Sequence, residues 1–481
     1  NKMDTKPQHS VPVPRLYKEA SKILRRYENK EGAIKTLVYK GKYKNFGRIY
    51  GLLCKTVENS AAIKAALVES SLYTNEPKFD PYLAQVLTAE MLGKGLLGDC
   101  KPILTLLKYE GKIRSFAGSN FSRHSSHVMK DNCPRYVRVN TLKTSLSNVQ
   151  YQLDNNGWSL QEYDPTQVTY SDFLKFIQEL GESTYLRDYH VDELLIFPPK
   201  TPFWDNFLYT NNDIILQDKA SCLPVLVSGI KPGSNVIDAC AAPGNKTSYI
   251  AAAINNTGHV VAIEKDLERY QTLQRLVVER RATCVTTLNQ DFTRLPLDKY
   301  SQVEFIFVDP SCSSSGVNLH NDEVPEERIR SLACFQAHLL RHALSFPSVQ
   351  EVIYSTCSVY VQENEEVVQN ALKEFQDQFE LEDLSEKLSG WKHFGNESFV
   401  FGRRCLRTRT DVDKCHGFFV AKFVRISKIC NRLTSVNKID KKRKQQKSFK
   451  NLEIVSGNSK NLESKLSEVV TCAKKKQKVK R

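Results

Sequence analysis

Short apolar segments alternate with helical stretches between residues 233 and 426, and this alternation constrains the fold more than any other feature of the chain. The helical stretches include 325–346 and 363–375. Strands that alternate with helices predict a largely parallel, doubly wound sheet and therefore an α/β domain. We expect the last strand to be antiparallel, because it follows a long irregular region instead of a simple crossover. The predicted strands are 235–240, 258–264, 284–291, 305–310, 351–357 and 417–426.

The rest of the chain differs in pattern from this domain. Residues 14–115 place apolar side chains at three- and four-residue spacing and predict an accessory helical module. Residues 118–132, rich in Ser, His and Asn, predict a linker. The next stretch contains "PRYVRVNTLK", "LLIFPP" and "NDIILQDKAS", which predict short strands and turns before a helix. The predicted parts are a helical module over 14–115, a small α/β segment over 133–226, a larger α/β domain over 227–428 and a tail over 429–481.

The C-terminal tail carries most of the formal net charge of +15. Residues 438–481 hold fifteen Lys and Arg residues against four acids, in blocks such as "KKRK" and "KKKQKVKR". Such blocks are typical of nuclear-localisation signals and nucleic-acid contacts, although a solvated solubility tail would look the same. The tail has too few apolar residues to form a core, so we predict that it is disordered.

Several classes of protein are disfavoured by what the sequence lacks. No run of 18 apolar residues is present, which argues against a transmembrane helix, and "NKMDTKPQHS" lacks the apolar region of a signal peptide. The 13 cysteines form no C-x-x-C pair, so we expect neither a disulfide framework nor a zinc site. We therefore expect the protein to occupy a reducing intracellular compartment. His338 and His342 have neither a third ligand nearby nor an H-E-x-x-H glutamate, so no metal is predicted.

The segment "DACAAPGNKTSYIAAAI" (238–254) joins the first predicted strand to a helix. A dinucleotide fold has G-x-G-x-x-G at this place, because several glycines let the backbone approach a pyrophosphate, but here Gly244 is the single glycine. A ligand that carries a ribose and an amino-acid carboxylate but no phosphate needs fewer glycines, and S-adenosylmethionine fits that description. Glu264 ends the second strand, where an acid binds ribose hydroxyls, and Asp291 ends the third strand near the expected adenine. The alternative is an ordinary strand-to-helix turn. This interpretation is the weaker one, because acids end two consecutive strands.

Two cysteines follow predicted parallel strands, Cys357 after "VIYST" and Cys312 after "FIFVDPS". Ligands of open α/β sheets bind at these strand ends. Methyl transfer to oxygen or nitrogen needs no thiol, whereas carbon 5 of a pyrimidine becomes nucleophilic once a thiolate adds to carbon 6. Asp309 is well placed to stabilise or protonate the ring nitrogen N3, and carbon 5 must then lose its proton before the thiolate leaves. The alternative is that both cysteines are simply small buried residues. Two thiols at equivalent strand ends make this interpretation less favoured.

The strand pattern of "PRYVRVNTLK" puts Arg135 and Arg138 near Tyr136. Arginines beside an aromatic side chain at a sheet edge suit RNA phosphates and stacked bases. An ordinary exposed strand has the same appearance, so both interpretations stay open from this segment alone.

Together these motifs resemble the signature set of the Sun-domain (nucleolar p120/Nop-type) RNA cytosine-C5 methyltransferases. The resemblance lies in "DACAAPGNKTS", "FVDPSCSSSG", "YSTCS" followed by "QENEEVV", and "HGFFVAKF". "PRYVRVNTLK" and "LQDKASCLP" are similar to the RNA-recognition segment that precedes the catalytic domain in that family, so the resemblance covers about 133–426. The helical N-terminal part, with "IKTLVY", resembles the member-five subgroup, whose substrate is large-subunit ribosomal RNA.

The resemblance implies a Rossmann-like S-adenosylmethionine-dependent methyltransferase and a role for each motif residue. Cys357 would attack carbon 6, Cys312 would assist release of the methylated product, and Asp309 would contact the base. Two departures from the family pattern are the order Pro310-Ser311 before Cys312 and the presence of His416 where an aspartate commonly precedes G-F-F. The implied cofactor pocket consists of Cys240, Ala241, Ala242, Pro243, Gly244, Asn245, Lys246, Glu264, Arg269, Asp291 and Asp309.

Two other functions compete with RNA methylation. A ribosome-assembly factor that binds RNA without catalysis would have no use for both cysteines, Asp309 and the cofactor acids. A DNA cytosine methyltransferase takes its nucleophile from a Pro-Cys loop and pairs it with an E-N-V glutamate, which this sequence lacks. We therefore expect an RNA substrate whose target cytosine leaves its stack. The resemblance implies that this RNA is large-subunit ribosomal RNA (28S/25S type) or part of a ribosomal precursor particle. We further expect a monomer, without metal or membrane, in the nucleus and nucleolus.

Overall fold

The computed structural model describes residues 11–29, 31, 34, 37, 38, 41, 46–117, 133–317 and 324–426. The predicted linker over 118–132 and the predicted tail over 429–481 lie outside the described residues. Contacts between backbone positions divide the chain into two compact units, one formed by residues 1–133 with 318–323 and the other by residues 134–317 with 324–481.

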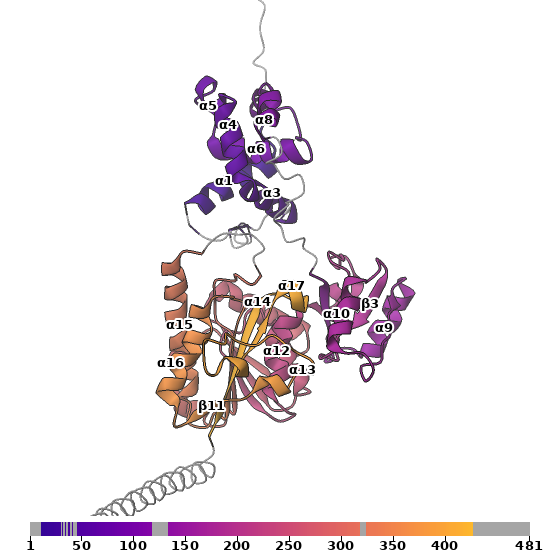
Figure 1. Cartoon of the computed structure of the whole chain (residues 1–481), viewed down its shortest axis with the longest axis vertical. Helices are drawn as coiled ribbons and strands as arrows, with labels where there is room; N and C mark the ends of the chain where they lie inside the picture. Colours follow the sequence, from indigo (N-terminus) through magenta and orange to yellow (C-terminus); the bar gives the residue numbers. More distant parts are fainter. Residues whose placement is uncertain are drawn as a thin grey trace, which may run out of the picture. The chain divides into compact units, whose positions relative to one another are not determined.

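The first unit is helical, as the spacing of its apolar residues predicts (Figure 1). Helix α6 forms its centre, because α6 is buried on nearly all sides and packs against α1, α3, α4 and α7. Its start is defined by Asp80, whose carboxylate accepts a hydrogen bond from the backbone N–H of Leu83 at 2.8 Å. The helices are α1 (Arg15–Glu28), α3 (Phe46–Glu58), α4 (Ser60–Glu69), α5 (Leu72–Asn75), α6 (Pro81–Gly93), α7 (Lys101–Leu107) and α8 (Glu110–Ala117).

The second unit begins with a small sheet in the strand order β2-β3-β4-β1-β5. Strand β1 pairs antiparallel with both β4 and β5, so it lies inside the sheet. This corrects the expectation that "PRYVR" forms a sheet edge. The strands are β1 (Arg135–Val139), β2 (Ser159–Leu160), β3 (Thr184–Arg187), β4 (Leu194–Phe197) and β5 (Ile214–Leu216), and the helices are α9 (Leu146–Asn155), α10 (Tyr170–Gln178) and α11 (Phe207–Thr210).

A larger sheet follows, with the order β11-β13-β10-β9-β6-β7-β8 and with β12 paired to β13. Strands β6 to β10 are mutually parallel, and β13 is antiparallel to β10, which confirms both expectations. Strands β11 and β12 are short, and no apolar run predicted them. The strands are β6 (Asn235–Asp238), β7 (His259–Ile263), β8 (Val285–Leu288), β9 (Phe305–Val308), β10 (Glu351–Thr356), β11 (Phe379–Leu381), β12 (Leu406–Thr408) and β13 (Phe418–Arg425).

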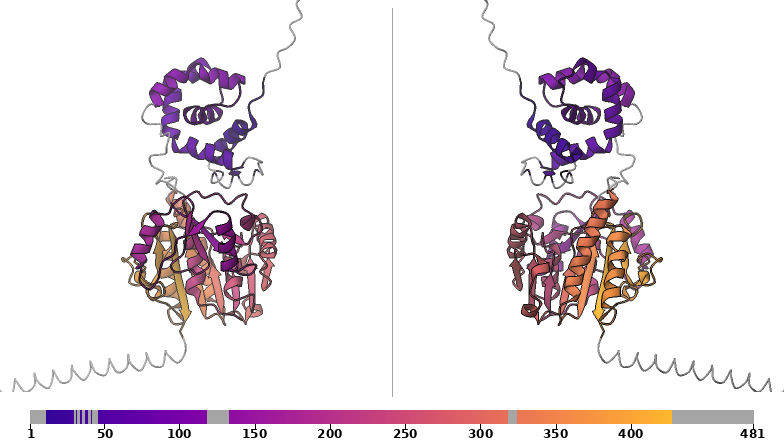
Figure 2. Two further views of the ribbon diagram at one scale, coloured as in Figure 1. Left: turned by 90° about the vertical axis from the view of Figure 1, so that its right-hand side faces the viewer. Right: turned by 90° about the vertical axis from the view of Figure 1, so that its left-hand side faces the viewer.

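Helices cover both faces of this sheet, as expected for a doubly wound fold. Alternate strand residues such as Val236 and Ile237 belong to different cores, one under α12 and α13 and the other under α15 and α16 (Figures 1 and 2). No described helix is long and apolar enough to span a membrane. The helices are α12 (Lys219–Ser228), α13 (Asn245–Ala253), α14 (Leu267–Glu279), α15 (Glu326–Leu344), α16 (Glu365–Phe375) and α17 (Thr410–Asp413), with 3-10 turns η2 (Phe292–Arg294), η3 (Leu297–Tyr300), η4 (Val361–Glu363), η5 (Leu384–Glu386) and η6 (Gly402–Arg404).

The order of the strands determines where a ligand binds. Strands β6 and β9 are neighbours, and the chain leaves β6 for β7 on one side and β9 for β10 on the other. The loops after β6 and β9 therefore diverge at a switch point, where open α/β sheets bind their ligands. The loop after β6 is the predicted cofactor loop, and the loop after β9 is the one that carries Cys312.

Candidate active site

The loop between β6 and α13 is held in one conformation by arginine side chains. Arg269 donates a hydrogen bond to the carbonyl of Ala242 at 2.7 Å, and Arg280 donates to the carbonyl of Gly244 at 3.1 Å. Gly244 has a φ of +107°, and an added Cβ would lie 3.1 Å from the side chain of Leu273. Glycine is thus required at this turn, and Arg269 stabilises the loop from α14.

A cavity of about 510 Å³ opens beside this loop. Glu264 is 5% exposed, accepts a hydrogen bond from the Asp266 backbone at 2.9 Å and lies 3.4 Å from the Arg269 guanidinium. Burial opposes ionisation of Asp291, but hydrogen bonds from Lys265 and Thr293 outweigh it and lower its pKa to about 2. The lining is Ala239, Cys240, Glu264, Lys265, Asp266, Leu267, Arg269, Gln290, Asp291, Phe292, Ser311, Phe335 and Leu339.

Carboxylates beside aromatic and aliphatic side chains suit a ribose and an adenine ring, so this lining fits S-adenosylmethionine. Of the residues predicted for the cofactor pocket, the cavity lining contains Cys240, Glu264, Arg269 and Asp291. Ala241, Ala242, Pro243, Gly244 and Asn245 are absent from the lining and form the turn behind it.

A second cavity, of about 200 Å³, is lined by Lys246 and Asp309, the two other residues predicted for the cofactor pocket, and by Cys357. Lys246 extends into it from α13, with Nζ 2.8 Å from the Asp309 carboxylate and 3.0 Å from the hydroxyl of Ser221. Burial acts to lower the pKa of Lys246, but the adjacent Asp309 carboxylate reverses this effect and raises it. The other Asp309 oxygen accepts a hydrogen bond from Ser355 at 2.7 Å. We call this the base cavity, and it is lined by Asp218, Ala220, Ser221, Lys246, Asp309, Pro310, Val317, Cys357, His416 and Phe418.

The two predicted cysteines lie against each other, with their Sγ atoms 3.1 Å apart. Cys357 lines the base cavity, and its sulfur is also 3.5 Å from the hydroxyl of Ser314. The hydrogen bond between the thiols lowers the pKa of Cys357 and raises that of Cys312. These two directions favour Cys357 as the thiolate of the pair and Cys312 as the thiol that donates to it.

One buried glutamate holds both cysteine loops together. Glu363 is 0% exposed, and its carboxylate accepts hydrogen bonds from Ser313 and Ser358, one residue beyond each cysteine. Gln336 of α15 donates to the same carboxylate at 2.9 Å. Glu363 lies inside the segment "QENEEVV", but its residue type gives no sign of this role, because a scaffold residue has no chemical signature of its own.

The three residues predicted to bind RNA occupy different environments. Arg138 is 0% exposed, donates hydrogen bonds to Gln217 at 2.8 Å and to Ser248 at 3.1 Å, and has its pKa lowered by burial. Tyr136 is 3% exposed and donates to the carbonyl of Lys414 at 3.0 Å. Both side chains join the small sheet to the larger domain and are buried there, so RNA binding by Tyr136 and Arg138 stays a prediction that their burial disfavours.

The third of these residues, Arg135, has a different environment. Its guanidinium lies 5.8 Å from the ring centroid of Trp204, a residue that is 60% exposed. An arginine on an exposed indole is a surface on which a nucleotide base can stack.

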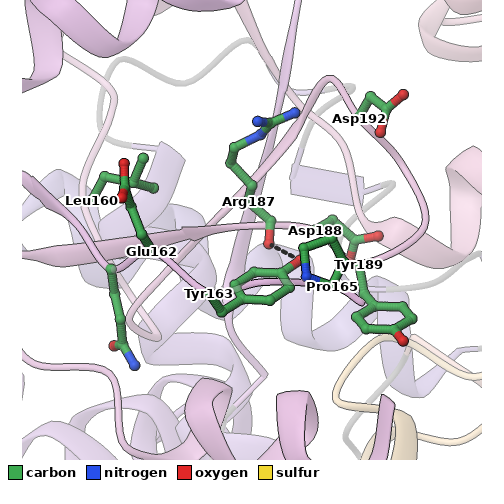
Figure 3. A pocket seen from close by; sticks show the side chains of 9 residues that line it. Leu160, Glu162, Tyr163, Pro165, Arg187, Asp188, Tyr189 and Asp192 are labelled. Carbon is green, nitrogen blue, oxygen red and sulfur yellow. Dashed lines mark hydrogen bonds between the residues drawn. The ribbon is translucent and has the colours of Figure 1, made fainter. Parts of the chain in front are cut away.

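The small domain has a hollow of its own, of about 260 Å³ (Figure 3). Its side chains include the acids Glu162, Asp188 and Asp192 and a single cation, Arg187, and Tyr163 donates a hydrogen bond to the Arg187 carbonyl at 3.2 Å. Asp188 is buried in an ion pair with Lys219, which leaves two carboxylates and one guanidinium, so the hollow has no excess of positive charge to attract a phosphate.

The strand order, the antiparallel β13 and the acid-ended strands beside a loop that lacks a phosphate-binding glycine pattern define an S-adenosylmethionine-dependent methyltransferase. A family model described as "16S rRNA methyltransferase RsmB/F" matches residues 226–424. A second, described as "NOL1/NOP2/Sun domain family member 5, ferredoxin-like domain", matches residues 133–217.

Known proteins agree with these matches. The chain is 37% identical over 432 residues to a 28S rRNA (cytosine-C(5))-methyltransferase of Mus musculus, covering 85% of this chain and 91% of the mouse protein. It is 34% identical over 435 residues to a Drosophila melanogaster protein of the same description, covering 88% of this chain and 98% of the fly protein. A 25S rRNA (cytosine-C(5))-methyltransferase of Schizosaccharomyces pombe, rcm1, is 33% identical over 84% of this chain and 90% of its own length.

Among solved structures, the crystal structure of PH0851 resembles the chain with a TM-score of 0.58 at 19% identity, covering 86% of this chain and 100% of that one. That likeness concerns the fold. The sequence matches go further: the chain belongs to the RsmB/F, or Nop/Sun, family of S-adenosylmethionine-dependent rRNA cytosine-C5 methyltransferases, in its member-five branch. The resemblance inferred from the motifs is confirmed.

Proposed function

We propose that this protein methylates carbon 5 of a cytosine in large-subunit ribosomal RNA through a covalent bond between Cys357 and carbon 6 of the base. The relatives described as 28S and 25S methyltransferases support the choice of substrate. The observation that carries the mechanism is the thiol pair, with Sγ atoms 3.1 Å apart, at the wall of a cavity that also contains Lys246 and Asp309.

Cys357 is the nucleophile. Its pKa is lowered by the hydrogen bond from Cys312, so more of it is thiolate at neutral pH than of an ordinary cysteine. The Asp309 carboxylate accepts a hydrogen bond from the ring nitrogen N3 and stabilises the proton that N3 takes up from solvent as sulfur adds to carbon 6. Lys246 holds this carboxylate in place at 2.8 Å. S-adenosylmethionine, when bound, supplies the electrophilic methyl group that carbon 5 then accepts.

Cys312 acts in the release of the product. A thiolate leaves carbon 6 more easily when a hydrogen-bond donor stabilises its charge, and the Cys312 thiol is positioned as that donor. Its raised pKa keeps the proton available at neutral pH. The sulfur atoms of Cys312 and Cys357 are in contact even though the proline before Cys312 is shifted by one position, to Pro310.

The substrate reaches this site as unstacked RNA, because carbon 6 is attacked from above the plane of the base. Arg135 on Trp204 offers a contact for a flanking nucleotide. The basic blocks after residue 438 support action in the nucleolus, on RNA or on a precursor particle, and we propose that the protein acts as a monomer.

A denaturing gel of cysteine variants incubated with S-adenosylmethionine and large-subunit ribosomal RNA tests this mechanism. We expect Cys312→Ser to accumulate a covalent protein–RNA band and Cys357→Ser to form none. Cys284→Ser, a partly buried thiol outside both cavities, is the control and should behave like the unmodified protein. A band with Cys357→Ser would make Cys312 the nucleophile instead. Absence of both adduct and methylation in the unmodified protein would favour a non-catalytic RNA-binding assembly factor.

A further inference from the structure

A histidine–aspartate pair lines the base cavity, and the mechanism above does not use it. His416 Nδ1 lies 3.1 Å from the carboxylate of Asp218, and the backbone N–H of His416 donates to the second carboxylate oxygen at 3.2 Å. Asp218 in turn caps α12 by accepting a hydrogen bond from the Ala220 backbone at 2.9 Å. Both His416 and Asp218 line the cavity with Cys357, so the pair borders the space that the target cytosine would enter.

Backbone hydrogen bonds connect His416 to the nucleophile. The Gly316 N–H donates to the carbonyl of Cys357 at 3.0 Å, and the Gly417 N–H donates to the carbonyl of Gly316 at 2.9 Å. The contact is close enough that a Cβ on Gly316 would lie 2.1 Å from the carbonyl oxygen of Gly417. The residue next to Gly417 is His416, so its distance from Cys357 is determined by backbone and not by flexible side chains.

The reaction needs a proton acceptor in this cavity. Carbon 5 is one bond from carbon 6, to which Cys357 attaches, so the acceptor must line the cavity that contains the Cys357 sulfur. Asp309 is paired with Lys246 and Ser355, and Cys312 lies against the Cys357 sulfur at 3.1 Å and is not part of the cavity lining. His416 differs, because a carboxylate at Nδ1 keeps the hydrogen on that nitrogen and leaves the Nε2 lone pair available.

We propose that His416 is a catalytic residue that removes the proton from carbon 5 of the methylated cytosine, and that Asp218 is the residue that positions it. The inference rests on the proposed function and extends it to the step that frees the product. The bond from carbon 5 to hydrogen breaks, and Nε2 of His416 takes the proton. The electron pair re-forms the double bond between carbons 5 and 6 as the bond from carbon 6 to sulfur breaks, and Cys357 leaves as a thiolate. The proton that N3 accepted during addition is returned in the same step.

Single-turnover reactions on RNA that carries tritium at carbon 5 of cytosine and a labelled methyl donor separate this step from methyl transfer. We expect His416→Ala and His416→Gln to transfer the methyl group within about threefold of the normal rate. Tritium release should fall by about 100-fold, the usual contribution of a general base, and a methylated covalent adduct should accumulate. Asp218→Asn should slow tritium release less, with the same accumulation. Added imidazole should restore tritium release to His416→Ala.

His393→Ala is the matched control, because His393 also pairs through Nδ1 with an aspartate, Asp413 at 2.7 Å, but lines neither cavity. It should leave the ratio of tritium release to methyl transfer unchanged. Tritium release that keeps pace with methyl transfer in His416→Ala overturns the inference, as does a His416→Ala protein that forms no adduct. If the unmodified protein forms no adduct through Cys357, the proposed function fails, which is a different result.

Discussion

The function of a single residue in this protein can be predicted from its type in some cases and not in others. Cys312 and Cys357 could be recognised because two thiols at equivalent strand ends suggest chemistry, and the structure brings their sulfurs within 3.1 Å. Arg138 looked like an RNA contact, yet it is 0% exposed and hydrogen-bonded inside the protein. Glu363 attracted no assignment, although its carboxylate holds the loops of both cysteines.

Replacement of Glu363 tests this scaffold at the scale of one residue. Glu363→Ala removes the acceptor that the buried donors of Ser313, Ser358 and Gln336 share, and we expect a loss of about 3 kcal/mol in the free energy of unfolding. Adduct formation should also fall, because the cysteine loops lose their common anchor. Urea unfolding measures the first effect and the covalent band the second. Glu366→Ala, at an exposed position three residues further on, is the control. Equal behaviour of the two variants would contradict the role of Glu363.

Elements of secondary structure bring the site together through close approaches of backbone. The loop after β9 and the start of β13 meet at Gly316 and Gly417, which are about one hundred residues apart in the chain. Glycine lets the two segments approach within hydrogen-bond distance, whereas any side chain would hold them apart. The loop that carries Cys312 is therefore positioned by the strand that follows His416.

A methyl group at this contact should separate the two elements. We expect Gly316→Ala to lower methyl transfer by more than 100-fold, since a misplacement of about 1 Å can cost that much, while the fold persists. Gly181→Ala is the control, because its added Cβ would lie at an ordinary distance of 3.5 Å from Thr184. Methyl transfer and thermal unfolding would be measured on both variants. Normal activity of Gly316→Ala would show that the contact does not position the site.

At the scale of the second unit, a buried polar cluster joins the small domain to the catalytic domain. Lys219 of α12 lies 2.8 Å from Asp188 and 3.1 Å from Nδ1 of His190, while Nε2 of His190 lies 2.9 Å from the carbonyl of Ser389. Burial and the Lys219 charge lower the pKa of His190 to about 4. The imidazole is therefore neutral in the folded protein at neutral pH.

This cluster predicts how stability changes with pH. The unfolded His190 has a pKa of about 6.5, so between about pH 6.5 and pH 4 the unfolded state binds a proton that the folded state does not. Stability should be complete above pH 6.5 and decrease as the pH falls to 4, with a slope from this residue of at most about 1.4 kcal/mol per pH unit. Urea unfolding from pH 4 to 8 measures it, and His190→Gln should remove this part of the slope. An unchanged slope in His190→Gln would contradict the assignment.

The sequence by itself determined the alternation of the main strands and helices, the antiparallel last strand, the cofactor loop and the two cysteines, but not the short strands β11 and β12. These features follow from local periodicity and from the rule that parallel strands present their carboxyl ends at one edge of a sheet. Only the tertiary structure decided which thiol faces the base, which arginines are buried and which residues far apart in the chain form pairs such as His416 with Asp218. Those properties depend on distances across the fold, and residue type and spacing along the chain do not encode such distances.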